Sequence, residues 1–191
     1  MSYPSILLAS ASPRRRELLA QLGVSFELVS GDIDETPRQN EAPADYVQRL
    51  AKAKAQAGLA RSDGRKPVLG ADTIVVADGQ ILGKPADFSI FSHTMQQLSG
   101  RCHQVMTAIA LLDQQHCLQQ LVCTEVCFRQ LSQNDIQYYW HTGEPQDKAG
   151  GYGIQGLAAK FVQRINGSYT AVVGLPLCET EQLLMQWQEQ R

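Results

Sequence analysis

The fold is decided by one stretch of the chain, Val68-Leu69-Gly70-Ala71-Asp72-Thr73-Ile74-Val75-Val76-Ala77-Asp78-Gly79-Gln80-Ile81-Leu82. Residues 67–77 are mostly apolar, which predicts a long strand in the protein core. Asp78-Gly79 is a two-residue turn signal, so we expect the chain to return through Gln80–Leu82 as a β-hairpin. A hairpin among alternating strands and helices predicts a mixed α/β sheet rather than a strictly doubly wound one.

Strands and helices are interspersed along the rest of the chain. Ser12 suits the N-cap of a first helix, Pro13 its first position and Gly23 its end. Apolar residues at helical spacing predict further helices over residues 44–60, 88–98, 132–140 and 179–188. Further strands are expected over residues 5–9, 26–29, 105–112, 118–128, 160–165 and 168–173. We therefore predict a single domain, residues 1–191, in which helices flank the sheet.

The composition is that of an ordinary globular protein and argues against several classes. Of the 191 residues, 43% are hydrophobic and 19% charged, and the formal charge of −2 disfavours a broad nucleic-acid-binding surface. No apolar run approaches the roughly 20 residues of a membrane span, and residues 1–4 show no secretory signal. The five cysteines lack C-x-x-C spacing, so we expect reduced thiols in a cytoplasmic protein; the alternatives are a zinc site or a disulfide.

Three arginines stand where a helix disfavours them. Arg14, Arg15 and Arg16 fall in the first turn of the first predicted helix, where free backbone N–H groups already make the helix end positive. A bound anion would remove this conflict, gripped by Arg14 or Arg15 and by the hydroxyl groups of Ser10 and Ser12. The alternative is a solvated arginine cluster.

Two further charges lie in apolar surroundings. Asp72 interrupts the core strand, where an unpaired carboxylate would be strongly destabilising. It must therefore form a salt bridge, bind a metal ion or lie at an open strand end, and the small residues Gly70 and Ala71 before it would admit a ligand. Lys54 lies on the apolar stripe of its helix, so it either extends past the core to solvent or reaches an anion such as Asp72 or a phosphate.

Three loops offer weaker signals. Asp34 and Glu35 are either solvent-facing turn residues or metal ligands, and Lys84 is either a surface charge or a phosphate-binding residue. The loop over residues 148–156 carries four glycines, which suits close approach to a planar ligand, with Gln155 able to read a base edge. An anion site, carboxylates for a divalent cation and lysines together favour phosphoryl chemistry over acyl transfer or redox chemistry.

The same segments resemble the Maf family of nucleotide pyrophosphatases. The likeness covers essentially the whole chain, in order, through Ser10-Ala11-Ser12-Pro13-Arg14-Arg15, Ile33-Asp34-Glu35, Arg49-Leu50-Ala51 with Lys54-Ala55, Gly70-Ala71-Asp72-Thr73, Gly83-Lys84-Pro85, Leu98-Ser99-Gly100, Asp147-Lys148-Ala149-Gly150 with its continuation Gly151–Gly156, and Val173-Gly174-Leu175-Pro176. Eight motifs in sequence make the resemblance specific. Arg14, Thr73 and Gln155 resemble the branch that acts on dTTP, UTP and modified pyrimidine nucleotides, because the 7-methyl-GTP branch carries S-P-W-R and S-D-Q instead.

The resemblance implies a fold, an activity and a cofactor. The fold would be the elongated mixed sheet of the inosine-triphosphate pyrophosphatases, with two lobes around a cleft. The activity would be hydrolysis of a nucleoside triphosphate, dTTP or UTP, to the monophosphate and pyrophosphate. A divalent metal cation, Mg²⁺ or Mn²⁺, and a homodimer are also implied.

Each site residue then has an expected role. Asp72 and Glu35 would hold the metal ion, with Asp72 also the general base that activates water against the α-phosphorus. Lys54 and Lys84 would complete the catalytic set by balancing the charge of the triphosphate. The expected substrate-binding residues are Ser10, Arg14, Arg15, Thr73 and Gln155. Two rival functions stay open: a non-catalytic nucleotide-binding regulator of cell division, and a DNA-binding module built on the arginines.

Overall fold

The computed structural model describes residues 3–190, and its strands form one mixed sheet. The strands are β1 (Ile6–Ala9), β2 (Phe26–Leu28), β3 (Val68–Ala77), β4 (Gln80–Leu82), β5 (Cys102–Leu112), β6 (Cys117–Phe128) and β7 (Val162–Asn166). Their order is β2-β1-β3-β5-β6-β7, with β4 paired to β3. β1 is parallel to β2 and β3, whereas the pairs β3–β4 and β6–β7 are antiparallel. The predicted mixed sheet is confirmed.

Helices connect the strands close to the expected positions. They are α1 (Pro13–Gln21), α2 (Pro43–Ala60), α3 (Phe88–Leu98), α4 (Gln133–His141), α5 (Tyr169–Val173) and α6 (Leu177–Glu189), with short 3₁₀ turns at Glu144–Asp147, Ala149–Gly151 and Leu157–Phe161. Across residues 3–190, no helix combines the length and the apolar character that crossing a bilayer requires.

Local sequence signals place several of these elements. Asp78 and Gly79 adopt φ values of 50° and 76° and join Ala77 to Gln80 in antiparallel register, so the predicted hairpin is confirmed. Ser12 is the N-cap of α1, because its side chain accepts a hydrogen bond from the backbone N–H three residues on, at 3.5 Å. Turn and cap chemistry therefore predicts these boundaries correctly.

One predicted strand is wrong. Residues 168–173 form the short helix α5 instead of a strand. Gly167 adopts φ 130°, and Ser168 Oγ accepts a hydrogen bond from the backbone N–H of Ala171 at 3.2 Å, in the manner of a helix N-cap. The capping contact outweighs the strand preference of the β-branched residues that follow.

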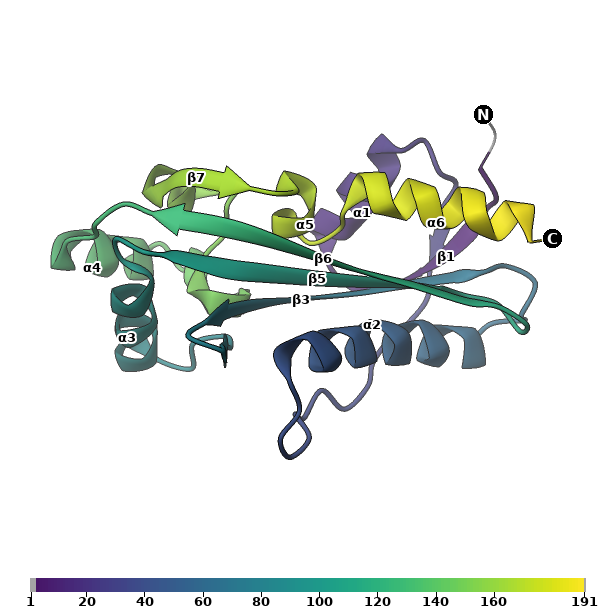
Figure 1. The fold of residues 1–191 in the computed structure, drawn as a ribbon, viewed down its shortest axis with the longest axis horizontal. Coiled ribbons are helices and arrows are strands. Elements are labelled where there is room, and N and C mark those ends of the chain that lie inside the picture. The colour runs from purple at the N-terminus through teal and green to yellow at the C-terminus, as the bar shows by residue number, and fades with distance from the viewer. Residues whose placement is uncertain (1–2, 191) are drawn as a thin grey trace. The chain divides into compact units, whose positions relative to one another are not determined.

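The chain divides into two compact units. Unit 1 comprises the described residues up to Asp72, Thr107–Val122 and those from Gly174 onward, and unit 2 comprises Thr73–Met106 and Cys123–Val173. Strands β3, β5 and β6 run through both. Within unit 1, α2 and α6 lie on opposite sides of the strands (Figure 1). The prediction of a single domain is not tested by this division and stays a prediction.

Gly70 sets the distance between α2 and β3 in unit 1. A Cβ atom at this position would lie 2.3 Å from the carbonyl oxygen of Ala51 and 2.6 Å from the backbone nitrogen of Ala55. The small residue therefore admits the backbone of α2, and the expectation that it makes room for a ligand is wrong. This close approach brings Lys54 of α2 beside Asp72 of β3.

The prediction of five reduced thiols is wrong for one pair of cysteines. Cys102 on β5 and Cys127 on β6, both in unit 2, form a disulfide with their Sγ atoms 2.03 Å apart. Cys117, Cys123 and Cys178 are exposed free thiols among the described residues. The pair is separated by 25 residues, so only the pairing of the strands reveals it.

Candidate active site

Three charged side chains of unit 1 form a compact cluster. The Lys54 Nζ atom lies 2.6 Å from Asp72 Oδ1 and 2.6 Å from Glu35 Oε1. The exposed fraction of the side chain is 13% for Lys54 and 10% for Asp72, but 52% for Glu35. Of the alternatives left open by the sequence, the geometry selects a lysine that reaches a buried carboxylate.

The two acidic residues of the loop before α2 behave differently. Glu35 joins the cluster through Lys54, whereas Asp34 Oδ1 accepts hydrogen bonds from the backbone N–H and the hydroxyl of Thr36, at 2.9 and 2.6 Å. These hydrogen bonds lower the pKa of the exposed Asp34 carboxyl. Asp34 is thus a turn residue, and Glu35 alone of the pair is available to a site at Asp72.

Arg15 turns back from α1 toward the same cluster. Its Nε atom donates to the carbonyl oxygen of Gly174 at 2.8 Å, and its Nη1 atom donates to Ser10 Oγ at 3.4 Å. Burial lowers the pKa of the Arg15 guanidinium, while the negative charge of Asp72 opposes this effect and the positive charge of Arg14 adds to it. Ser10, Arg15 and the carboxylate cluster therefore belong to one region of unit 1.

The electrostatic state of Asp72 suits a proton acceptor. Burial raises the pKa of the Asp72 carboxyl above its ordinary value, against the opposing positive charges of Lys54 and Arg15. A carboxylate whose pKa is raised by burial takes up a proton more readily than a solvated one, which is the property required of a general base.

Two residues without a predicted role hold the Glu35 loop on α2. The Tyr46 hydroxyl donates to the backbone carbonyl of Glu35 at 2.8 Å, and Arg49 Nη2 donates to the carbonyl of Thr36 at 3.2 Å. Arg49 Nη2 also donates to Glu41 Oε2 at 2.7 Å. Tyr46 lies on the buried side of α2, where an aromatic residue is expected for packing alone. The polar hydroxyl of this residue, close in sequence to a loop with two acidic residues, is the signal that could have identified its contact with the loop.

The other predicted site residues belong to unit 2. Thr73 directly follows Asp72 on β3 and is half-buried, Lys84 is exposed after β4, and Gln155 is exposed in the loop over residues 148–156. The structure gathers Ser10, Arg15, Glu35, Lys54 and Asp72 within unit 1. The roles expected for Thr73, Lys84 and Gln155 stay predictions, as does that of Arg14.

The glycine-rich loop packs against the protein itself. A Cβ atom on Gly150, which adopts φ 67°, would lie 2.8 Å from the side chain of Val75 on β3. Tyr152 is buried, with its hydroxyl 2.7 Å from His103 Nε2 and its ring centroid 4.8 Å from that of Phe128. The sequence predicted that a planar ligand approaches these glycines closely. At Gly150, the group that approaches closely is the core of unit 2.

The residues present fit a hard divalent cation. Glu35 Oε1 and Asp72 Oδ1 both lie 2.6 Å from one ammonium nitrogen, so two carboxylate oxygens already converge on a single cationic position. Carboxylate oxygens are the ligands that Mg²⁺ and Mn²⁺ prefer. The Lys54 ammonium occupies this position in the structure.

Comparison with known proteins identifies the family of this chain. The chain belongs to the family described as Maf-like protein, whose pattern matches residues 5–187. It is 58% identical over 180 residues to the dTTP/UTP pyrophosphatase of Pseudoalteromonas translucida (strain TAC 125), covering 94% of this chain and 95% of that protein. It is 57% identical over 180 residues to the dTTP/UTP pyrophosphatase of Shigella sonnei (strain Ss046), covering 94% and 91%. A solved structure, the Staphylococcus aureus Ham1 protein, matches with a TM-score of 0.45 and 12% identity over 65% of this chain and 71% of that chain.

Proposed function

We propose that this chain is a pyrophosphatase that hydrolyses dTTP and UTP to the nucleoside monophosphate and pyrophosphate. The observation that carries the proposal is the cluster of Asp72, Lys54 and Glu35 beside Arg15, in a chain 58% identical to a protein of that name. A buried carboxylate, an ammonium and a guanidinium are the groups that phosphoryl transfer needs for activating water and balancing charge. The non-catalytic regulator stays the alternative.

In the proposed reaction, Asp72 accepts the proton of the attacking water. The water oxygen forms a bond to the α-phosphorus, the bond to the bridging oxygen breaks, and pyrophosphate leaves. The raised pKa of Asp72 supports this role, because the carboxyl is better matched to proton transfer than a solvated aspartate. Lys54, Arg15 and Ser10 donate to phosphate oxygens, and positioning supplies much of the rate enhancement.

We further propose that Glu35 and Asp72 hold a Mg²⁺ or Mn²⁺ ion. A divalent cation bound there would lower the pKa of a water ligand and neutralise phosphate charge. Lys84 is proposed to bind the triphosphate, whereas Arg14, Thr73 and Gln155 are proposed to discriminate the base. The assignment of these four residues rests on their match to the family motifs.

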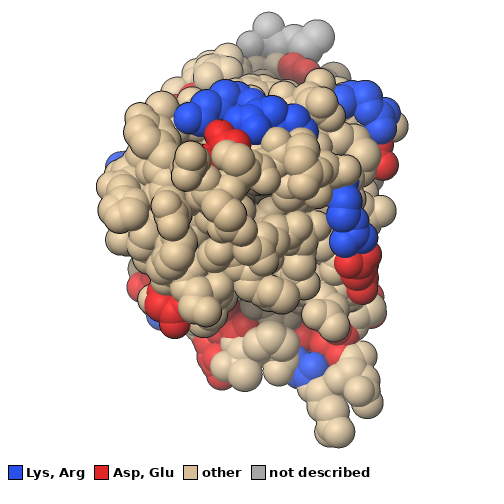
Figure 2. All heavy atoms as spheres, turned by 90° about the vertical axis from the view of Figure 1, so that its left-hand side faces the viewer, with Lys and Arg blue, Asp and Glu red and all other residues tan. Residues whose placement is uncertain are grey.

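We propose a cytoplasmic homodimer. The face over α3 and α4 of unit 2 is largely free of charged side chains (Figure 2). It exposes Phe88, Ile90 and Tyr138 by 37%, 49% and 58%, and exposed apolar side chains of this size are enriched at interfaces between proteins. Light scattering after gel filtration tests this proposal, with a mass of twice 21.1 kDa expected for the dimer.

A nucleotide panel tests the activity directly. The protein is incubated with Mg²⁺ and dTTP, UTP, GTP or 7-methyl-GTP, and both products are measured. We expect monophosphate and pyrophosphate in equal amounts, with kcat/KM for dTTP and UTP at least about tenfold above that for the purines. Release of orthophosphate would contradict the assigned bond. Binding of dTTP without turnover would favour the regulator.

A further inference from the structure

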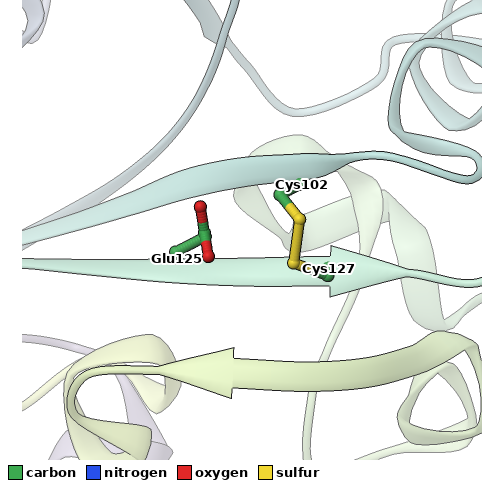
Figure 3. Close-up of side chains that lie close together, drawn as sticks. All are labelled: Cys102, Glu125 and Cys127. Atoms are coloured by element: carbon green, nitrogen blue, oxygen red, sulfur yellow. A yellow bond between two sulfur atoms is a disulfide. The ribbon is translucent and has the colours of Figure 1, made fainter.

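A row of side chains crosses β5, β6 and β7 in unit 2 and has no part in the proposed reaction. Cys102 on β5 is bonded to Cys127 on β6, and Cys127 pairs in register with Arg164 on β7. Glu125 lies beside the disulfide on β6 (Figure 3). Its carboxylate oxygen and the two sulfur atoms all lie within 4.8 Å of one another. The row thus joins two sulfur atoms, a carboxylate and a guanidinium.

Arg164 places a positive charge beside the disulfide. Its Nη2 atom lies 3.4 Å from Cys127 Sγ and 3.9 Å from Cys102 Sγ, and an ion pair with Glu125 Oε1 at 2.8 Å holds it there. A neighbouring cation stabilises a thiolate, and a stabilised thiolate is a better leaving group in thiol–disulfide exchange. Because Cys127 Sγ is the nearer sulfur, it is the favoured leaving atom.

The two cysteines also differ in accessibility. Cys102 is exposed, whereas Cys127 is 7% exposed. A thiol arriving from solvent therefore meets Cys102 first. Attack at the accessible sulfur and departure of the sulfur beside the guanidinium are the two features that make exchange at a disulfide fast and directional.

Each cysteine precedes a buried aromatic residue that holds the glycine-rich loop. His103 follows Cys102 and Phe128 follows Cys127, and both rings pack edge-on against Tyr152, with centroid distances of 5.4 and 4.8 Å. Tyr152 anchors the loop over residues 148–156. Breaking the link between β5 and β6 therefore acts on the two residues that hold Tyr152 in place.

We propose that Cys102–Cys127 is a thiol–disulfide exchange site for low-molecular-weight thiols such as glutathione, and that its state controls how firmly Tyr152 is held. The glutathione thiolate attacks Cys102 Sγ, the disulfide bond breaks, and its electron pair leaves on Cys127 Sγ. A second glutathione thiolate attacks the mixed disulfide at the glutathione sulfur and releases the Cys102 thiolate. The two glutathione thiols are oxidised to glutathione disulfide, and the protein disulfide is reduced to two thiols.

The test uses a chain in which the other cysteines are replaced, as Cys117→Ser, Cys123→Ser and Cys178→Ser. The folded protein is equilibrated with glutathione and glutathione disulfide at graded ratios, quenched with acid, alkylated and weighed by mass spectrometry. We expect two alkyl groups per chain in the most reducing mixtures and none in the most oxidising ones, with the far-ultraviolet circular dichroism unchanged. No nucleotide is present, so the outcome is independent of the proposed pyrophosphatase activity.

Variants of one arginine test the proposed leaving group. Arg164→Gln is expected to slow reduction by glutathione about threefold, because the Cys127 thiolate loses its neighbouring charge. Arg164→Lys should restore most of the rate. Arg65→Gln is the matched control, since this arginine of unit 1 is 85% exposed and lies outside the row. Equal rates in Arg164→Gln and the unsubstituted chain would overturn the proposal.

Two further outcomes would also overturn it. A disulfide that survives every glutathione mixture in the folded chain is purely structural, and two thiols in every mixture mean that no disulfide forms.

Amide hydrogen exchange supplies the readout for Tyr152. Exchange over residues 150–156 is expected to be faster in the reduced chain, and equal protection in both states would exclude any control of the loop.

Discussion

The two units hold their loops in place by different physical means. In unit 1, the loop before α2 is tied down by charge, through Lys54 with Glu35 and Arg49 with Glu41. In unit 2, the glycine-rich loop is held by close packing around the Tyr152 ring. Ion pairs near a surface contribute little to stability but set local charge, whereas buried rings contribute mainly through packing. Substitutions in unit 1 should therefore change chemistry, and those in the core of unit 2 should change stability.

Removing the carboxylate at the centre of unit 1 should have the largest effect. Asp72→Asn is expected to lower kcat for dTTP by a factor on the order of 10² to 10⁴, because the amide cannot accept a proton or bind a metal ion as the carboxylate does. Pyrophosphate release is the measurement. Asp63→Asn is the control, since that carboxylate is exposed and pairs with the likewise exposed Arg65, away from the cluster. Near-normal turnover in Asp72→Asn would remove this residue from its assigned role.

Acid should destabilise the aromatic core of unit 2 through His103. Burial lowers the pKa of His103 to about 4, against about 6.5 in an unfolded chain. As the pH falls, the unfolded state binds a proton at this histidine before the folded state does. The contribution of His103 to the free energy of unfolding is therefore complete above pH 6.5 and declines as the pH falls toward 4. Linkage places this loss at about 3 kcal/mol. Denaturant unfolding at several pH values should show a smaller decline in His103→Gln than in the unsubstituted chain, with the exposed His93→Gln as control.

Loss of one hydroxyl should lower the stability of unit 2. The hydroxyl of the buried Tyr139 donates to Glu144 Oε1 at 2.7 Å and accepts from the backbone N–H of Gly153 at 3.0 Å. Tyr139→Phe leaves both groups without this partner and should lower the free energy of unfolding by about 1 to 2 kcal/mol. The exposed Tyr138→Phe should change it by less than about 0.5 kcal/mol. Equal stabilities for the two variants would contradict the stabilising role of the buried Tyr139 hydroxyl.

The smallest effect is expected at the tip of the glycine-rich loop. Gln155→Glu replaces an amide that both donates and accepts with an acceptor only, and it should shift the dTTP-to-GTP ratio of kcat/KM by about fivefold, or about 1 kcal/mol. Because Gln155 is exposed, the unfolding midpoint should not move. An unchanged ratio would show that this residue does not discriminate the base.

Local chemistry explains which parts of the fold were predictable. The hairpin at Asp78-Gly79 and the cap at Ser12 depend on a few neighbouring residues, and both are confirmed. The strand expected at residues 168–173 failed because a single hydroxyl, Ser168 Oγ, caps a helix there. Likewise, the disulfide joins residues that only strand pairing brings together, so spacing along the chain contained no signal for it.

Part of the candidate site could likewise be predicted from the residues that neighbour it in the sequence. Lys54 and Asp72 were conspicuous because each is a charge among apolar neighbours, and they lie in contact. Tyr46 was missed because an aromatic residue on an apolar stripe gives no sign that its hydroxyl meets a loop carbonyl. A glycine in a strand indicates that another group approaches the backbone closely, but it does not indicate whether that group is a ligand or a helix. The role of Gly70 therefore could not be predicted from the sequence.

The contact at Gly70 has a consequence for how this protein can change over time. One added methyl group would lift α2 from β3 and carry Lys54 away from its acidic partner, so a single substitution would damage folding and charge balance together. Gly70 therefore cannot be replaced without cost, because any larger residue at this position requires a compensating shift of the whole helix. Libraries that diversify this strand should therefore hold position 70 fixed and vary its neighbours.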